Sequence, residues 1–493
     1  MLKDFFTVTV RYLRRNKGFT AINIAGLALG IATCLVILLF VTDELGYDRF
    51  NQKADRIVRV VFRGVMQGGE IREANVMPPV AQALKNDFPE VLEATRIRPI
   101  GAPRLLSGTK IFREDRLAYV DTNFFEVFSL PLIKGNARTA LSQPNSVVIT
   151  RAVAEKIFGK EDPVGKILLS KEDDLKPMMV TGEIESIPQN SHFHFGLFAS
   201  MTGVPDASSP SWMTSNYFTY LVLPEGYDYR KLEARLPAEM DKYVGPQMQQ
   251  GLGISLQEFK KRGNSLGLFL QPLTSIHLHS DLTGELEANS DIRYVYIFSA
   301  VAVFMLLIAC INFMNLSTAG ANRRAREVGV RKVLGSMRGQ LIARFLGESV
   351  LLTTIAFGLA VGLVYWVLPF FNDLAGRSLS FHWGTNPGLL AMLIGLALIT
   401  GILAGSYPAF FLSSFKPIAV LKGRFVAGKR TASLRSALVV FQFFISIGLI
   451  VGTTVVYKQL SYIQNKRLGY DREQVIIVQE PWWLGKHLEA YRQ

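Results

Sequence analysis

Five apolar runs, each long enough to cross a lipid bilayer, restrict what this chain can fold into more than any other feature. In the first, the 21 residues at 21–41 carry no charge. As an α-helix they extend about 32 Å, slightly more than the ~30 Å hydrocarbon core of a membrane. The run is too long for a cleaved signal peptide, so we interpret it as an uncleaved anchor. We place the spans at residues 20–42, 292–316, 345–371, 388–412 and 436–457, and they predict an integral membrane α-helical bundle.

The segment between the first two spans, residues 43–291, is long enough to bury a core of its own. Runs rich in Val, Ile and Tyr alternate along it with helical patterns. We expect strands at 56–62, 146–149, 178–181 and 217–223, and helices at 80–88 and 151–158. These elements predict a large mixed α/β (α+β) domain. A patch containing Gly, Ser and Pro at 203–211 marks either a lobe boundary or a mobile loop.

The net charge of +14 is confined to short segments that flank the apolar runs. Residues 1–19 carry five basic and one acidic side chain, residues 317–344 seven and one, and residues 413–435 six and none. A nucleic-acid-binding protein would spread its basic charge over a folded domain, so this pattern argues against that class. Because basic loops lie on the cytoplasmic side of a membrane, it predicts a cytoplasmic interfacial helix at 1–19, a cytoplasmic segment at 317–344 and a cytoplasmic linker at 413–435. The domain at 43–291 and the short loop at 372–387 then lie outside.

The basic segment between the second and third spans has the pattern of an amphipathic helix over 322–343. Glu327 lies four residues from both Arg323 and Arg331, so that either pair supports a helix. The apolar residues recur at spacings of three and four, as on one helical face: Val330, Val333, Leu334, Met337 and Leu341. Two interpretations follow. The helix is either only a marker of the cytoplasmic side or a docking element for a cytoplasmic partner.

Common catalytic patterns are missing from the sequence. It contains no GxxxxGK[ST] phosphate loop, no GxSxG and no HExxH motif, so we predict no catalytic residue and no cofactor in this chain. Two histidine pairs, His192 with His194 and His277 with His279, would each share a face if they lay on strands. Such pairs can bind a metal, but ordinary surface or turn histidines are the interpretation that we prefer, and no metal site is expected.

Four of the five spans contain GxxxG, a pattern that lets helix backbones approach closely in lipid. These glycines serve packing within one bundle or form a seam between two subunits. They are Gly26 and Gly30, Gly358 and Gly362, Gly401 and Gly405, and Gly448 and Gly452.

The pentapeptide LGYDR occurs twice, at 45–49 after the first span and at 468–472 after the fifth. Each copy follows a basic segment and one apolar span, and each precedes a strand-like run. We therefore interpret residues 458–493 as the start of a second domain like that at 43–291. We expect the intact protein to continue with the rest of that domain and with further spans.

Several stretches resemble one family of membrane proteins. The run ACINFMNLSTAGANRRAREVGVRKVLGSMRGQLIARFLGES at 309–349 is similar to the FtsX-like permease domain of MacB-type ABC transporters. The run SYPAFFLSSFKPIAVLKG at 406–423 is similar to the end of that domain. PNSVVITRAVAEKIFG with DPVGK at 144–166, and IPQNSHFHF at 187–195, resemble the MacB-type periplasmic core domain. RRNKGFTAINIAGLALGIA resembles the first span of the family, in its duplicated permease subtype.

The resemblance implies a permease of the bacterial cell inner membrane that has no nucleotide-binding site, with ATP bound by a separate cytoplasmic ABC ATPase. The ATPase would dock on the helix between the second and third spans and move it, and the spans would pass the movement to the periplasmic domain. Such coupling is called mechanotransmission. The resemblance also implies a dimer or pseudo-dimer, with a periplasmic adaptor and an outer-membrane channel as further partners. The residues that match the docking helix are Arg323, Arg324, Arg326, Glu327, Arg331 and Lys332.

Two functions are consistent with this resemblance. In the first, the permease serves export or extraction of a peptide, a lipoprotein or a hydrophobic compound. In the second, it is regulatory, and activates an extracytoplasmic hydrolase or signals to a sensor kinase. Neighbouring genes distinguish the two, because an outer-membrane channel and an adaptor accompany export, whereas a cell-wall hydrolase or a kinase accompanies regulation.

Overall fold

The computed structural model describes residues 17–108, 110–113, 116–170, 176–319, 321–380, 387–415 and 429–466. The second LGYDR copy and most of the segments 1–19, 413–435 and 458–493 lie outside these ranges, so what we predict for them stays a prediction. The chain divides into two compact units. One consists of Met1–Gly26, Leu307–Thr353 and Leu398–Gln493, and the other of Leu27–Leu306 and Thr354–Ala397.

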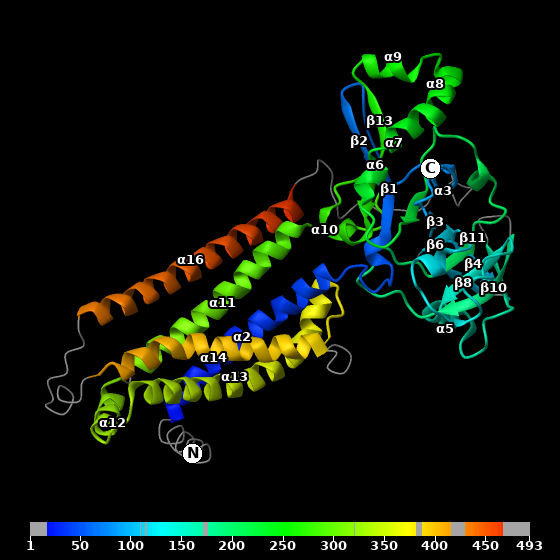
Figure 1. Cartoon of the computed structure of the whole chain (residues 1–493). Coiled ribbons are helices and arrows are strands. Elements are labelled where there is room, and N and C mark those ends of the chain that lie inside the picture. Colours follow the sequence, from blue (N-terminus) through cyan, green and yellow to red (C-terminus); the bar gives the residue numbers. More distant parts are fainter. Residues whose placement is uncertain are drawn as a thin grey trace. The chain divides into compact units, whose positions relative to one another are not determined.

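Within the described residues, five helices are long and apolar enough to cross a membrane (Figure 1). Each of them covers one of the five predicted spans. A helix suits this environment because it satisfies its backbone N–H and C=O groups internally, where lipid offers no partner. The helices are α2 (Lys17–Leu45), α11 (Ile292–Ala319), α13 (Arg338–Ala375), α14 (Pro387–Ser413) and α16 (Lys429–Asn465).

The amphipathic helix predicted over 322–343 is not continuous, and this part of the prediction is wrong. The helix α12 (Ala321–Val333) ends before Gly335, and α13 begins only at Arg338. Gly335 has a φ of +92°, a left-handed conformation that costs glycine little. Its N–H donates to the Lys332 carbonyl, and the N–H of Ser336 donates to the Arg331 carbonyl, which together close the helix end in a Schellman motif.

The domain between α2 and α11 is built on one mixed sheet of 13 strands. The strand order is β13-β1-β12-β3-β6-β11-β8-β10-β9-β4-β5, with β2 paired to β1 and β7 to β10. The pairs β8–β10 and β6–β11 are parallel. The strands are β1 (Ile57–Met66), β2 (Gly69–Glu73), β3 (Glu93–Gly101), β4 (Arg104–Ser107), β5 (Lys110–Arg113), β6 (Leu117–Val120), β7 (Leu132–Lys134), β8 (Ser146–Thr150), β9 (Ile167–Ser170), β10 (Lys176–Ile184), β11 (Leu197–Ser200), β12 (Phe218–Val222) and β13 (Ser265–Pro272).

Short helices accompany the sheet, so the predicted α+β class is confirmed. The predicted strands correspond to β1, β8, β10 and β12, and the two predicted helices to α3 and α5. The 203–211 patch is packed, with Val204 and Ala207 buried in one cluster with Tyr217. The helices are α3 (Val80–Asp87), α4 (Phe124–Val127), α5 (Arg151–Phe158), α6 (Tyr229–Glu233), α7 (Leu236–Glu239), α8 (Gly245–Leu252), α9 (Leu256–Lys261) and α10 (Ile276–His279).

Strand β12 shows why the sheet has a core on each face. Successive side chains of a strand point to opposite faces, and all five residues of β12 are buried. Phe218 and Tyr220 belong to one hydrophobic cluster, whereas Leu221 belongs to a second. The first cluster is rich in aromatic rings, and Phe124 lies within it with its ring centroid 5.3 Å from that of Phe198.

Replacing Phe124 by Ala tests this aromatic cluster. The side chain is fully buried, so the cavity left behind should lower the free energy of unfolding of the domain by about 3–5 kcal/mol. Hydrogen exchange of the sheet amides in the full chain in detergent micelles would measure the loss. Phe269→Ala, at an exposed position of β13, is the matched control and should cost about 1 kcal/mol or less. Equal losses in the two variants would contradict the placement of the core.

Candidate functional sites: helix α12 and the junction at the end of α2

Helix α12 is held in its unit by one buried face. Ala325 and Val328 are almost fully buried and pack in a cluster with residues of α13 and α14. Leu341 and Phe345 come from α13, and Leu412 from the end of α14. This face buries its apolar side chains, while Arg326 is exposed on another side, as expected for an amphipathic helix. The helix is therefore packed against two neighbours rather than free at a membrane surface.

Lys332 secures this packing. Its ammonium group donates to the carbonyl of Ser413 at 2.7 Å and to the carbonyl of Phe415 at 2.9 Å. The last carbonyls of a helix have no partner within the helix and carry partial negative charge, so a cation at the end of α14 stabilises that end. The sequence predicts Lys332 as a docking residue, whereas this contact gives it a structural role. The 81-residue separation from Ser413 hides the contact from any periodicity argument.

Glu327 holds two cations of its own unit. Its carboxylate lies 3.0 Å from the guanidinium of Arg331, the i,i+4 pair that the sequence predicts, and 3.7 Å from that of Arg344. Both contacts are partly exposed, and such pairs contribute about 1 kcal/mol or less to stability. The backbone of Arg323 and Arg324 lies in α12, but their side chains are outside the described part of the chain.

The other side of α12 exposes apolar side chains next to cations. Val333, Leu334 and Met337 are 64, 80 and 73% exposed. A shallow cavity of about 670 Å³ lies along this side. Apolar patches rimmed by polar groups mark surfaces that meet a partner or a membrane. The residues that line the cavity are Arg326, Glu327, Val330, Arg331, Leu334 and Ser336.

The first LGYDR copy forms the turn in which α2 leads into the sheet domain. A Cβ at Gly46 would lie 2.9 Å from the Thr42 carbonyl, so the turn requires glycine there. The Gly46 carbonyl accepts a hydrogen bond from the side-chain amide of Asn190 at 3.0 Å. The backbone N–H of Asp48 donates to the Asn190 carbonyl at 2.7 Å. Two of the motifs noted in the sequence, LGYDR and IPQNSHFHF, therefore meet at this junction.

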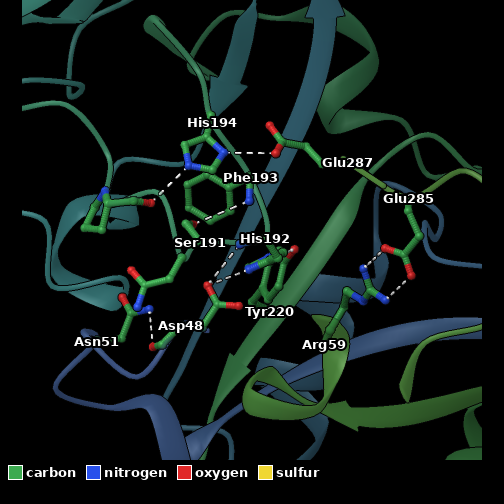
Figure 2. Close-up of polar contacts among 12 residues, drawn as sticks. Asp48, Asn51, Arg59, Ser191, His192, Phe193, His194, Tyr220, Glu285 and Glu287 are labelled. Atoms are coloured by element: carbon green, nitrogen blue, oxygen red, sulfur yellow. Dashed lines mark hydrogen bonds and ion pairs between the residues drawn. The ribbon is translucent and has the colours of Figure 1, made fainter. Parts of the chain in front are cut away.

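A buried chain of hydrogen bonds continues from the turn into the sheet (Figure 2). The Asp48 carboxylate lies 2.8 Å from Nδ1 of His192, and Nε2 of His192 lies 2.7 Å from the hydroxyl of Tyr220 on β12. A neutral imidazole satisfies both contacts, with Nδ1–H donating to the carboxylate and Nε2 accepting from the hydroxyl. Burial raises the pKa of Tyr220, which keeps this hydroxyl protonated as the donor.

A second buried contact, which the sequence gives no sign of, fixes the neighbouring part of the sheet. The Arg59 side chain on β1 is fully buried, and its two Nη atoms lie 2.5 and 2.8 Å from the two carboxylate oxygens of Glu285 (Figure 2). Gln271 accepts a further hydrogen bond from Arg59 at 2.7 Å. Such a two-pronged pair has a fixed geometry. Removing either partner would leave a buried charge, which is strongly destabilising.

Four residues from different parts of the same unit meet at the end of α2. The buried carboxylate of Glu44 lies 3.0 Å from Nε2 of His277 on α10 and 2.5 Å from the guanidinium of Arg377, which follows α13. The Tyr47 hydroxyl contacts the same guanidinium, and the Tyr47 ring stacks on His277 with centroids 3.3 Å apart. Burial by itself lowers the pKa of Arg377, but its contacts with Tyr47 and Glu44 raise it, so this cation stays charged.

The two histidine pairs do not form the metal site that the sequence left open. His277 and His279 lie on the short helix α10, not on a strand, because the segment 276–279 makes one helical turn. His192 is engaged as above, and His194 contacts the Glu287 carboxylate at 2.9 Å and the Pro188 carbonyl at 3.0 Å (Figure 2). In the part of the chain that the structure describes, no group of three or more His, Cys, Asp or Glu side chains is placed to hold a metal ion.

The GxxxG glycines differ in what surrounds them. A Cβ at Gly405 would lie 2.5 Å from Cβ of Ser349, and one at Gly401 would lie 3.0 Å from Cα of Val350, so α14 packs closely on α13 at these points. A Cβ at Gly26 would lie 3.2 Å from the amide nitrogen of Asn312. Gly30 is buried. Cβ atoms at Gly358, Gly362, Gly448 and Gly452 would meet no described atom within 4 Å.

Comparison with known families matches two parts of the chain. A model described as the MacB-like periplasmic core domain matches residues 20–239. A model described as the FtsX-like permease C-terminal matches residues 299–417. The second match contains α12 and the end of α14, and the first contains the LGYDR turn and β12.

Individual proteins are similar over much of the chain. The pyoverdine export ATP-binding/permease protein PvdT of Pseudomonas syringae pv. syringae is 23% identical over 437 residues, which are 85% of this chain and 59% of PvdT. The uncharacterized ABC transporter permease YvrN of Bacillus subtilis is 22% identical over 450 residues, 85% of this chain and 99% of YvrN. A crystal structure of a permease-protein domain from Porphyromonas gingivalis covers 50% of this chain and 98% of its own, with 24% identity and a TM-score of 0.40.

Replacing Asp48 by Ala should destabilise the sheet domain. It would leave the Nδ1–H of buried His192 without its acceptor, and an unsatisfied buried donor costs about 1–3 kcal/mol. Hydrogen exchange of β12 in the full chain would report the loss. Asp55→Ala is the control, because its side chain is 83% exposed, and it should change stability by about 0.5 kcal/mol or less. A stable Asp48→Ala domain would contradict a structural role for this chain of hydrogen bonds.

Gly405→Ala and Gly448→Ala form a matched pair that tests helix packing. The added methyl group at Gly405 meets Ser349 and should force α14 away from α13, at a cost of about 1–3 kcal/mol. The methyl group at Gly448 meets nothing in the described chain and should leave its stability unchanged. Thermal unfolding of the two variants in one detergent would compare them. Equal melting temperatures would mean that Gly405 does not pack within the chain.

Proposed function

Because this chain is a member of the MacB- and FtsX-like ABC transporter permeases, we propose that it couples ATP hydrolysis by a separate cytoplasmic ATPase to movement of its sheet domain. The observation that carries the proposal is the division of α12 into two sides. One side is packed into the protein, and the other exposes apolar and basic side chains along a shallow cavity. A docking element needs both properties, since it must bind a partner and pass on the partner's motion.

The packed side supports the transmission of force. The Schellman turn at Gly335 joins α12 directly to α13, and Lys332 ties it to the end of α14. Moving α12 would therefore move both helices or break a buried cluster, and breaking such contacts costs more than a rigid shift. We propose that ATPase dimerisation displaces α12 and that α11 and α13, each of which has residues in both units, carry the displacement outward. The N-terminus lies in the cytoplasm in this proposal, and the sheet domain outside the inner membrane.

Contacts of α11 with α2 and α10, inside the larger unit, support transmission of the displacement to the sheet domain. Val295, in the first turn of α11, packs with Val41 of α2 and Leu278 of α10. Phe298 of α11 meets Phe40 of α2 edge to face, with ring centroids 5.2 Å apart. Interdigitated side chains transmit displacement because packed interiors are barely compressible. A shift of α11 along its axis would reach α2 and α10 through these side chains.

Export or extraction of a peptide, a lipoprotein or a hydrophobic compound is the use of this movement that we propose. PvdT is named for pyoverdine export, which favours export over the regulatory alternative for this chain. PvdT is also named as an ATP-binding protein, and this chain spans 59% of its length. The sequence contains no GxxxxGK[ST] phosphate loop, and in this proposal a partner subunit binds the ATP. A periplasmic adaptor and an outer-membrane channel are further partners in this proposal, and the permease works as a dimer or pseudo-dimer.

The double substitution Arg326→Glu with Leu334→Asp tests the docking surface. Both side chains line the exposed cavity of α12 and neither belongs to its buried cluster, so the variant should fold and insert normally. Stimulation of the partner ATPase, measured with both proteins in nanodiscs, should fall about tenfold or more, as for loss of interface hot-spot residues. Lys231→Glu, a charge reversal at an exposed position of the sheet domain, is the control.

Two other outcomes are informative. Unchanged stimulation with unchanged co-purification would remove the docking assignment from α12. Weaker membrane insertion with unchanged stimulation would mean that the exposed side binds lipid headgroups instead. Lys332→Met is expected to behave differently from both, because it should loosen the end of α14, and faster hydrogen exchange at residues 409–415 would show it.

A further inference from the structure

The larger unit contains a cavity of about 600 Å³ between the end of α2, the chain after α13 and the start of α14. Its volume falls within the range of small-molecule sites, about 300–1,000 Å³. All the described residues that line it belong to this one unit. They are Leu39, Thr42, Asp43, Gln189, Asn190, Ser378, Leu379, Ser380, Gly388 and Met392.

The lining changes character from one part of the chain to the next. Leu39 and Met392 lie within the apolar runs of α2 and α14, near the ends at which these runs stop. Gln189, Ser378 and Ser380 come from polar segments outside those runs. A cavity with an apolar part inside the hydrocarbon and a polar part at headgroup level matches a molecule with the same division, an amphiphile.

The two neighbouring acids at the end of α2 differ in how they are paired. Glu44 is buried and holds short contacts to both His277 and Arg377. Asp43 lines the cavity and is partly exposed, and its contact with Arg377 is long, at 3.9 Å. The Coulomb attraction between Asp43 and Arg377 is weaker than that between Glu44 and Arg377, because their charged atoms lie 3.9 Å rather than 2.5 Å apart. The cavity therefore presents a carboxylate to whatever occupies it.

Hydrogen-bonding groups accompany this carboxylate. The hydroxyl of Thr42 is used within its own helix, where it donates to the Leu39 carbonyl, and the Asn190 amide donates to Gly46. The Gln189 amide and the Ser378 hydroxyl also line the cavity and offer both donor and acceptor atoms. In a ligand headgroup, a cation could contact the Asp43 carboxylate, and further polar atoms could form hydrogen bonds with Gln189 and Ser378.

We propose that this cavity binds a cationic amphiphile, with its ammonium group against Asp43 and its hydrocarbon chain along Leu39 and Met392. The assignment rests on the proposed function in one respect, because it takes this end of α2 to lie at the outer surface of the inner membrane. Two sources share this chemistry, an aminolipid of the membrane and an acylated peptide that carries a lysine or a free amine. An occupant would touch Asp43 and Asn190, and so would lie against the turn that joins α2 to the sheet domain.

A photolabelling experiment on the full chain tests the proposal without any ATPase. The chain is placed in phosphatidylcholine nanodiscs with a dodecylammonium probe that carries a diazirine in its chain. We expect labelled peptides around Leu39 and Met392, and displacement of the probe by dodecylammonium at about tenfold lower concentration than by dodecanol, since a charge-assisted contact adds roughly that factor. Labelling spread evenly over all apolar helices, or equal displacement by the two competitors, would overturn it.

Two variants sharpen the test. Asp43→Asn should remove the preference for dodecylammonium over dodecanol while the uncharged competitor binds as before, and Asp55→Asn should leave the preference intact. Ser378→Phe should fill the polar part of the cavity and lower labelling about tenfold. Hydrogen exchange of α10 checks that each variant keeps its fold. If Asp43→Asn does not fold, Ser378→Phe and the competition on the unmodified chain decide the matter, and unaffected labelling in Ser378→Phe would refute the site.

The two sources are then separated by competition on the unmodified chain. Lysophosphatidylethanolamine and a palmitoylated lysine peptide are compared as competitors of the probe, and the one that displaces it at lower concentration identifies the class of natural ligand. Failure of both would overturn the proposal. The docking variant of α12 should be labelled normally, so the outcome here is independent of whether α12 binds an ATPase.

Discussion

Glu44 lies where the first apolar helix stops and the sheet domain begins, and its carboxylate is buried there. An unpaired charge in such a place costs several kcal/mol. Its two partners, His277 and Arg377, come from α10 and from the chain after α13. These three parts of the larger unit must therefore keep one relative geometry, since separating any of them would leave a buried charge without its partner. A movement of the end of α2 consequently moves α10, and through it the sheet domain, rather than bending a loose linker.

A second set of contacts, without a cation, starts from the same turn. Asp48, His192 and Tyr220 connect the turn to β12, which lies between β1 and β3 in the sheet. Each residue of GYD in the LGYDR motif thus has its own physical task. Gly46 fits against the Thr42 carbonyl, Tyr47 stacks on His277, and Asp48 begins the buried chain of hydrogen bonds. The first copy of the motif is explained as a rigid connection between a membrane helix and a sheet.

The spans and the main strands were predictable because short-range pattern determines them. Lipid demands long apolar helices, and β12 shows the Val, Tyr and Phe content of a buried strand. Contacts between distant residues were not predictable, since periodicity carries no information about pairs such as Asp48 with His192, 144 residues apart. The break after Val333 was predictable in principle, because Gly335 followed by Ser336 is a usual helix end. The apolar spacing from Val330 to Leu341 concealed this break. The spacing looks continuous, but its residues belong partly to α12 and partly to α13.

The position of Lys332 supports the docking interpretation of the basic segment, which we propose. A helix that only marks the cytoplasmic side, or lies on the headgroups, needs charge and an apolar face but no attachment to the other helices. Here the face that carries Ala325 and Val328 is buried in the protein, and the Lys332 ammonium group donates hydrogen bonds to the carbonyls at the end of α14. The apolar side chains left exposed, among them Leu334 and Met337, lie in the turn that follows α12, a helix that its buried face holds in place. A fixed helix with an exposed apolar and cationic surface suits the proposed docking, because a partner that pushed on it would move α13 and α14 with it.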